Sequence, residues 1–190
     1  SLDVPHVSTY SLILEEHTKL FLENMKNISE ELDAKMYELI CSKLSNFSHY
    51  EISNFAKDNL YSKHNLCYWN NDNYYGFGLG ASGYLDNIRY TNTKSITYYL
   101  QEKYCYGKEE IGYYDMMEYQ IILNLRTKWG ISKQKFFTKY HKQLNEVFPY
   151  SMLVYDGYLV DNDDFVFIPE KYWYLSNEIM VKLLEECNYE

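Results

Sequence analysis

The order of strand-like and helix-like segments in the first 55 residues constrains the fold more than any other feature of the sequence. Residues 6–14 (HVSTYSLIL) are rich in β-branched and aromatic residues, which favour a buried strand. Residues 30–45 have apolar side chains at helical spacing, and Ser29 before them is a residue type that caps helices. Residues 47–55 (FSHYEISNF) again have the composition of a strand. This order predicts one unit of an α/β fold with a parallel sheet.

The middle of the chain is predicted to be less regular. Residues 56–73 are polar and lack periodicity, so we expect a long loop, and loops of that length are often functional. Residues 74–79 predict a short strand, residues 84–90 a hairpin, and residues 95–103 a short helix.

The last third of the sequence predicts helices around a small β-wing. Gly130 is expected to end a helix, and Ser132 to cap the next one. Helices are expected at residues 115–128, 133–141, 143–155 and 172–187, and short antiparallel strands at residues 157–160 and 165–168. This order predicts a winged-helix-like module, so the predicted fold class is α/β followed by α+β.

The charge of the chain argues against nucleic acid as a partner. Net charge is −9 and no basic block is present, whereas nucleic-acid binding needs cations that replace phosphate counterions. A cluster of acidic residues could hold a metal ion, but we expect an acidic turn with solvated carboxylates. Its members are Asp156, Asp161, Asp163 and Asp164.

Cysteine spacing and hydropathy predict a cytoplasmic protein with reduced thiols. The four cysteines lie at positions 41, 67, 105 and 187, and no two have the spacing of a zinc or iron–sulfur motif. The sequence has no apolar run of about 18 residues, so no membrane span is predicted. We also see no secretory signal pattern at the first residues.

Two segments are candidates for ligand binding. The glycines of residues 76–83 (GFGLGASG) would let backbone approach a ligand, but their spacing also suits a tightly packed strand end, which spacing alone favours. Residues 64–69 (HNLCYW) offer an imidazole and a thiol to heme iron, and aromatic rings to a flat ligand. An ordinary loop with a hydrogen-bonded histidine and two buried aromatic residues fits the same pattern, and spacing alone favours that loop.

Several segments together resemble one protein family. Residues 6–15 resemble the late-barrel strand HISxYSLIxE of oxygen-independent coproporphyrinogen III oxidase-like radical-AdoMet proteins, and residues 50–57 resemble their YEISNFAK segment. Residues 64–69 match HNxxYW, and residues 76–83 match GxGxGAxG with some tolerance in spacing. Residues 125–131 resemble the opening of the family's C-terminal domain. These matches follow one another in order and cover nearly the whole chain.

The resemblance implies a fold and a set of sites. The family fold is an incomplete (β/α) barrel that binds AdoMet and a 4Fe–4S cluster, followed by a winged-helix-like domain. By resemblance, residues 1–107 would be the C-terminal portion of the barrel and residues 108–190 the helical C-terminal domain. The residues that the resemblance implies near AdoMet are Ser11, Leu12, Ile13, Gly78, Gly80 and Ala81.

The HNxxYW motif resembles the heme-chaperone (HemW-type) branch, in which it is implicated in heme binding. The resemblance therefore implies heme contacts at His64, Asn65, Cys67, Tyr68 and Trp69. Heme-acceptor proteins would then be further partners. The alternative is the oxidase itself, which converts coproporphyrinogen III to protoporphyrinogen IX by oxidative decarboxylation. A third hypothesis makes the C-terminal module only a lid or a protein-interaction domain.

The sequence departs from the family pattern in one important respect. The family's cluster is held by a Cys-x3-Cys-x2-Cys loop, and no such spacing occurs here. The early AdoMet-binding strands have no counterpart either, and Asp58 replaces a proline that follows the YEISNFAK segment in the family. We therefore expect a fragment of a longer protein, with no catalytic residues of its own, that neither holds the cluster nor cleaves AdoMet.

Overall fold

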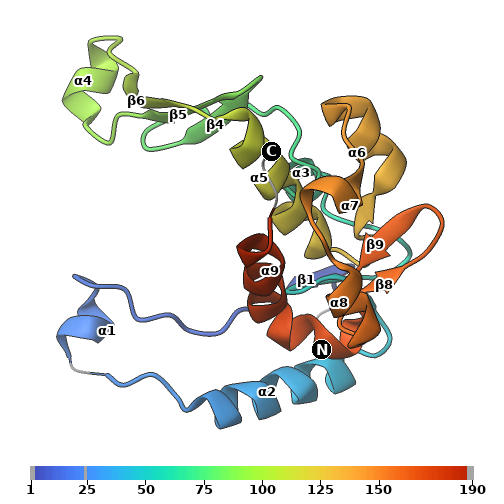
Figure 1. Ribbon diagram of the computed structural model, residues 1–190. Coiled ribbons are helices and arrows are strands. Elements are labelled where there is room, and N and C mark those ends of the chain that lie inside the picture. The colour runs from blue at the N-terminus through green and yellow to red at the C-terminus, as the bar shows by residue number, and fades with distance from the viewer. Residues whose placement is uncertain (1–2, 24, 188–190) are drawn as a thin grey trace. The chain divides into compact units, whose positions relative to one another are not determined.

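The computed structural model describes residues 3–23 and 25–187 and divides them between two compact units (Figure 1). The first unit is Ser1–Tyr61 and the second is Ser62–Glu190. Each unit is described by itself below. The division expected from the sequence, between residues 107 and 108, falls inside strand β6 (Cys105–Glu110) of the second unit.

The first unit contains a small sheet in which neighbouring strands are antiparallel. The strands are β1 (His6–Ser8), β2 (Ser48–Glu51) and β3 (Asn54–Ala56), in the order β1-β3-β2. The predicted parallel pairing is therefore wrong, because β3 pairs with both of the other strands and separates them.

A tight turn explains why the predicted strand at residues 47–55 is in fact two strands. The Glu51 carboxylate is fully buried and accepts hydrogen bonds from the Ser53 backbone N–H, at 3.0 Å, and from the Asn54 side-chain amide. These bonds fix the chain reversal between β2 and β3. A buried carboxylate needs such donors, because an unpaired buried charge is strongly unfavourable.

The helix predicted at residues 30–45 is confirmed as α2 (Glu30–Lys43). The Ser29 hydroxyl accepts a hydrogen bond from the Leu32 N–H, as expected of an N-cap. A separate short helix, α1 (Lys19–Leu22), precedes it. The strand predicted at residues 6–14 ends at Ser8, and its expected burial is wrong, since Leu12 and Ile13 are 65% and 78% exposed.

The second unit begins with helix α3 (Lys63–Trp69) and an antiparallel sheet of order β4-β5-β6. The predicted hairpin is confirmed as β4 (Ser82–Leu85) and β5 (Ile88–Asn92), with Leu85 opposite Ile88 and Asp86 at φ +56° in the turn. The strand predicted at residues 74–79 is reduced to one bridge, from Tyr74 to Tyr84. The predicted short helix is confirmed as α4 (Ile96–Leu100).

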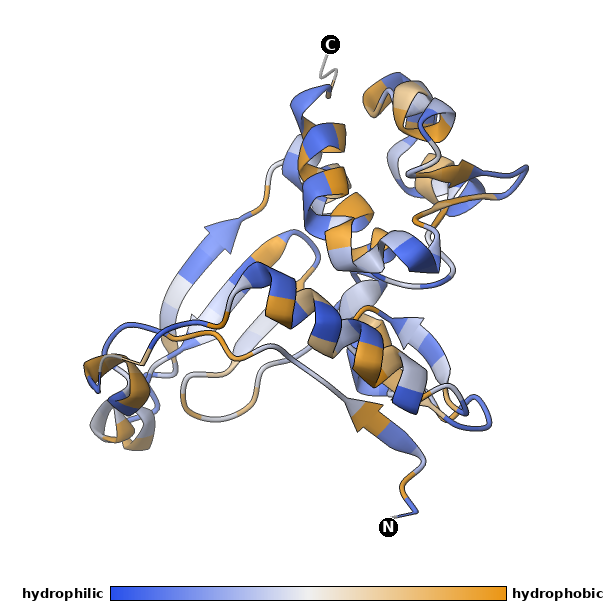
Figure 2. Ribbon diagram, turned by 90° about the horizontal axis from the view of Figure 1, so that it is seen from below, coloured by the Kyte–Doolittle hydropathy of each residue, from blue (hydrophilic) through white to orange (hydrophobic). Residues whose placement is uncertain are grey.

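Helices and a small sheet follow toward the C-terminus. The helices are α5 (Tyr113–Leu125), α6 (Lys133–Tyr140), α7 (Leu144–Val147), α8 (Ser151–Tyr155), the 3-10 helix η1 (Glu170–Leu175) and α9 (Ser176–Glu185). The strands are β7 (Ile131–Ser132), β8 (Val160–Asp161) and β9 (Phe165–Phe167), in the antiparallel order β7-β9-β8. Figure 2 shows how hydrophobic and hydrophilic residues alternate along α9, which leads to the marked C-terminus.

Some predicted boundaries in this region are corrected. The helix predicted at residues 143–155 is divided into α7 and α8, because Pro149 between them lacks the N–H that a continuous helix needs. Gly130 does not end α5, which stops at Leu125, but turns the chain into β7 with φ +66°. Ser132 caps α6 as predicted, since its hydroxyl accepts from the Lys135 N–H.

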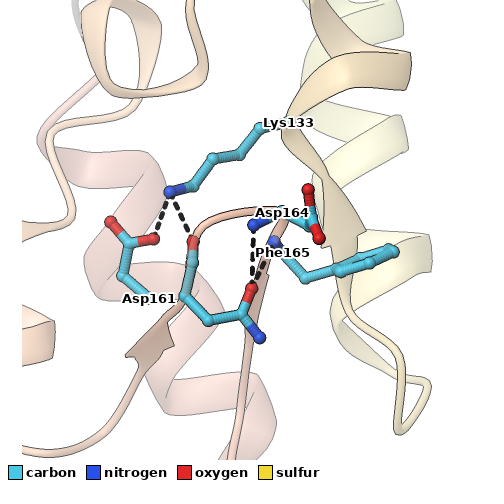
Figure 3. A network of polar contacts seen from close by, with 5 residues as sticks. Lys133, Asp161, Asp164 and Phe165 are labelled. Carbon is cyan, nitrogen blue, oxygen red and sulfur yellow. Dashed lines mark hydrogen bonds and ion pairs between the residues drawn. The ribbon is translucent and has the colours of Figure 1, made fainter.

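The turn between β8 and β9 is held by Asn162 and Lys133, and Figure 3 shows Lys133 beside Asp161. The Asn162 side-chain oxygen accepts hydrogen bonds from the N–H groups of Asp164, at 3.0 Å, and Phe165, at 2.6 Å. The Lys133 ammonium donates to the Asn162 carbonyl at 2.7 Å and forms an ion pair with Asp161. One member of the acidic cluster is therefore neutralised within the protein.

The core of the second unit lies among its helices and the β7-β9-β8 sheet. Its largest fully buried side chains are Trp173, Phe136, Phe148, Met117, Ile121, Leu125, Ile131, Leu159, Ile168 and Leu183. Within the described part of the chain, no helix has the length and apolar character that a membrane crossing requires.

Candidate functional site

The HNLCYW segment forms helix α3 rather than the loop that its composition predicted. The Ser62 hydroxyl caps the helix by accepting a hydrogen bond from the Asn65 N–H at 3.2 Å. Seven residues are too few to show a helical period, and they lie within the polar segment of residues 56–73, so the sequence pattern indicates a loop. The candidate residues thus share one short, rigid element.

His64 and Tyr68 lie one turn apart on the same face of α3. Their side chains share a hydrogen bond, with His64 Nε2 and the Tyr68 hydroxyl 3.0 Å apart, and their rings meet edge to face at 4.8 Å. Tyr68 in turn packs against Tyr74, at 4.5 Å between ring centres. His64 is exposed, so its imidazole is accessible from solvent while Tyr68 orients it.

Trp69 faces a different neighbour, helix α5. The Arg126 guanidinium lies 4.9 Å from the centre of the Trp69 ring, which is a cation–π contact. The Trp69 indole N–H is buried and has no hydrogen-bond partner. The predicted stacking of Trp69 on a ligand ring stays a prediction, because in this structure the ring packs on Arg126.

Helix α5 contacts α3 (Figure 1), and two of its amide side chains fix the C-terminal end of α3. Asn124 donates to the Trp69 carbonyl at 2.7 Å, and Gln120 donates to the Asn70 carbonyl at 3.1 Å. Carbonyls at a helix end have no partner within the helix, so these bonds satisfy them. Neither residue is among the site residues predicted from the sequence, although two amides four positions apart on an apolar helix are a usable signal.

Cys67 is half-buried, and its thiol is poorly suited to bind iron as a thiolate. Its Sγ lies 3.6 Å from the Asn73 carbonyl oxygen. Burial and, to a smaller extent, the nearby Asp72 carboxylate raise the pKa of the Cys67 thiol. Since the thiolate is both the nucleophile and the metal ligand, a raised pKa lowers reactivity at neutral pH.

We expect iodoacetamide to alkylate Cys105 severalfold faster than Cys67 at pH 7.5. Cys105 is exposed on β6, whereas the raised pKa of Cys67 leaves less of it as thiolate at any pH below that pKa. Peptide mass spectrometry over a time course measures both rates. In urea the two rates should converge, and a faster Cys67 in the folded chain would contradict this account.

The glycine segment packs mainly on its own neighbours. The Gly76 N–H donates to the Tyr90 hydroxyl at 2.9 Å, and the Asn92 side chain donates to the carbonyls of Gly76 and Gly78 at 3.1 and 3.0 Å. A side chain at Gly76 would lie 2.3 Å from the Ser82 carbonyl oxygen. Gly76 therefore fits the prediction of a tightly packed segment. Gly78, at φ +98°, has open space beside it.

The residues proposed near AdoMet belong to both units. Ser11, Leu12 and Ile13 are in the first unit, where the Ser11 hydroxyl donates to Asp33 at 2.6 Å. Gly78, Gly80 and Ala81 are in the second unit, where the Gly80 N–H donates to the Thr93 carbonyl at 3.0 Å. A role for these six residues at AdoMet stays a prediction.

The residues present do not fit a 4Fe–4S cluster. None of the four cysteines forms a disulfide, and their sequence spacing lacks the family's three-cysteine loop. Within residues 3–23 and 25–187, no group of three or more His, Cys, Asp or Glu side chains is arranged to hold a metal ion.

Comparisons with curated proteins find relatives along nearly the whole chain. The chain is 35% identical to the heme chaperone HemW of Lactococcus lactis, in an alignment that covers 99% of the chain and 53% of that protein. Identity to the heme chaperone HemW of Bacillus subtilis is also 35%, over 98% of the chain and 52% of the relative. The chain thus spans about half the length of these curated relatives. No family model matches the chain.

A vertebrate protein and a solved structure are also similar. The mitochondrial radical S-adenosyl methionine domain-containing protein 1 of Danio rerio is 42% identical over 84 residues, which cover 41% of the chain and 19% of that protein. Coproporphyrinogen III oxidase (HemN) from Escherichia coli, a radical SAM enzyme, matches with a TM-score of 0.63 at 11% identity, over 82% of the chain and 41% of HemN. This likeness shows a mixed α/β fold shared with part of HemN, and nothing about activity.

Proposed function

Because the chain is related over nearly its whole length to the HemW heme chaperones, we propose that it contributes heme binding to a heme chaperone. Heme is the cargo in this proposal, and the delivery activity belongs to a protein about twice as long. The observation that supports it best is the exposed His64 imidazole on a helix fixed at both ends.

We propose that His64 binds the heme iron and that Tyr68 controls its availability. A neutral imidazole nitrogen is a common ligand of heme iron. In the absence of heme, His64 Nε2 shares its hydrogen bond with the Tyr68 hydroxyl, 3.0 Å away. For Nε2 to bind iron, that hydroxyl must turn away, so Tyr68 competes with iron for this nitrogen while orienting the ring.

A hemin titration tests the role of His64. We expect His64→Ala to weaken hemin binding at least tenfold, about 1.4 kcal/mol, and to change the Soret band, because the iron loses a nitrogen ligand. The matched control is His141→Asn, since His141 is exposed at φ +54° in the same unit and Asn tolerates that conformation. Absorbance titration of the purified chain measures both.

The Tyr68→Phe variant separates the hydroxyl from the ring. It keeps the aromatic packing on Tyr74 and frees His64 Nε2, so hemin binding should be unchanged or tighter. If His64→Ala and the wild type give the same affinity and the same Soret spectrum, His64 is not the iron ligand.

The alternative activity, oxidation of coproporphyrinogen III, has less support. The likeness to HemN is at 11% identity and concerns the fold alone. The curated relatives that match nearly the whole chain are named heme chaperones.

For the parent protein we propose the organisation expected from the sequence. Residues 1–107 would form the later part of an incomplete radical-SAM barrel, and residues of the parent outside this chain would hold the cluster. Residues 108–190 would form a winged-helix-like domain, which the order of α5, α6 and the β8–β9 hairpin supports. A heme-acceptor protein and a cytoplasmic location stay predictions.

A further inference from the structure

A cavity of about 550 Å³ lies beside α3, on the side away from His64. Leu66 and Asn70 of the α3 region line it, and at 100° per residue they lie roughly opposite His64 and Tyr68. The rest of its wall comes from Asp72 after α3, from α5 and the turn after it, and from β7, α6 and β9. Cavities of 300–1,000 Å³ hold ligands of drug size, so this one is large enough for a ring-bearing molecule.

The cavity contains positive charge that is incompletely compensated. Lys135 and Lys139 line it from successive turns of α6, and Asp72 is the acidic side chain in its described wall. The Lys139 ammonium donates to the Gln120 side-chain oxygen at 2.8 Å, and burial lowers the Lys139 pKa. In the described part of the chain, no carboxylate pairs with the Lys135 ammonium. An anionic group bound in the cavity would pair with both ammonium groups.

Aromatic side chains surround these lysines. Phe136 forms part of the cavity wall and is buried, whereas Trp129 and Phe165 are 39% and 37% exposed. Partly exposed aromatic side chains beside a cavity favour a flat apolar ligand, which would remove more of their surface from water. The cavity therefore combines cations for an anionic group with flat surfaces for a ring.

We propose that this cavity binds the carboxylate groups of a planar ring ligand, and that in a heme-binding protein this ligand is a tetrapyrrole held by its propionates. The choice of a tetrapyrrole as the ligand rests on the proposed heme function. The cavity itself is separate from His64. Lys135 and Lys139 would pair with the carboxylates, and Trp129 and Phe165 would cover part of the ring.

The test uses iron-free protoporphyrin IX, which has the carboxylates but no metal for His64. We expect the double variant Lys135→Gln/Lys139→Gln to bind it at least tenfold more weakly, measured by quenching of tryptophan fluorescence. Lys135→Arg/Lys139→Arg, which keeps both charges, should retain binding, as should the control Lys171→Gln, because Lys171 is exposed on η1 outside the cavity. The dimethyl ester of the porphyrin lacks the carboxylate charges. It should therefore bind the wild type weakly, with an affinity similar to that of the free acid for the glutamine double variant.

The outcomes separate this inference from the heme proposal. If the acid does not bind the wild type, or binds the glutamine variant equally well, the cavity does not recognise carboxylates, and the inference is overturned. The hemin titration with His64→Ala then still decides the heme function. Circular dichroism of each variant verifies that the fold is intact, and loss of binding in the arginine variant as well would also overturn the charge-based inference.

Discussion

Replacing Trp173 with alanine is expected to lower the free energy of unfolding of the second unit by about 3–5 kcal/mol. Trp173 is 1% exposed and is the largest fully buried side chain. Its indole N–H donates to the Ile168 carbonyl at 2.9 Å. The alanine variant would leave a cavity in the core and a buried carbonyl without its donor, and both effects destabilise the fold.

Urea denaturation followed by circular dichroism measures this loss. The matched control is Trp129→Ala, since Trp129 is 39% exposed in the same unit, and its loss should cost less than that of Trp173 because less of its side chain is buried. Similar losses in the two variants would mean that Trp173 is not part of a cooperative core.

Replacing Gly130 with alanine is expected to cost about 2–5 kcal/mol. Gly130 has φ +66°, a conformation that costs an L-residue about 1–2 kcal/mol. An added Cβ would also lie 2.1 Å from the Val166 carbonyl oxygen and 2.8 Å from the Phe167 Cα. These are backbone atoms of β9, so relief requires the sheet to shift, with a cost of about 1–3 kcal/mol.

The Gly157→Ala variant separates the two causes. Gly157 has φ +79°, but an added Cβ there meets no atom within 4 Å. Gly157→Ala should therefore lose only the free energy that a positive φ costs an L-residue, about 1–2 kcal/mol. Thermal and urea unfolding measure the loss of stability in each variant. The extra loss in Gly130→Ala is the cost of the close contact with β9. Equal losses would show that the β9 backbone accommodates a methyl group without cost.

Local chemistry made several elements predictable from the sequence. Ser29 and Ser132 were expected to begin helices, and both hydroxyls cap the N–H groups three residues later. The hairpin around Asp86 follows from a turn in which one residue takes a positive φ. The ordered motifs also predict a similarity to heme chaperones, and the 35% identity to two HemW proteins supports it.

Predictions failed where a distant contact decided the structure. The parallel sheet was wrong because β3 inserts between β1 and β2, a pairing that the strand-helix-strand pattern does not specify. Helix α3 was missed because much of its support comes from Gln120 and Asn124, about 50 residues away in sequence. Strand β6 was not predicted because all of its residues are exposed, so its sequence lacks the alternation of apolar and polar residues that indicates a half-buried strand.

The sequence by itself therefore determined where chain segments start and turn, and which known proteins the chain resembles. Only the tertiary structure decided that His64 and Leu66, two residues apart, face opposite sides of α3, and that Leu66 shares a cavity with Lys139. The reason is physical. Caps and turns depend on neighbouring residues, whereas a site depends on which distant segments pack together and on what each face of a helix then meets.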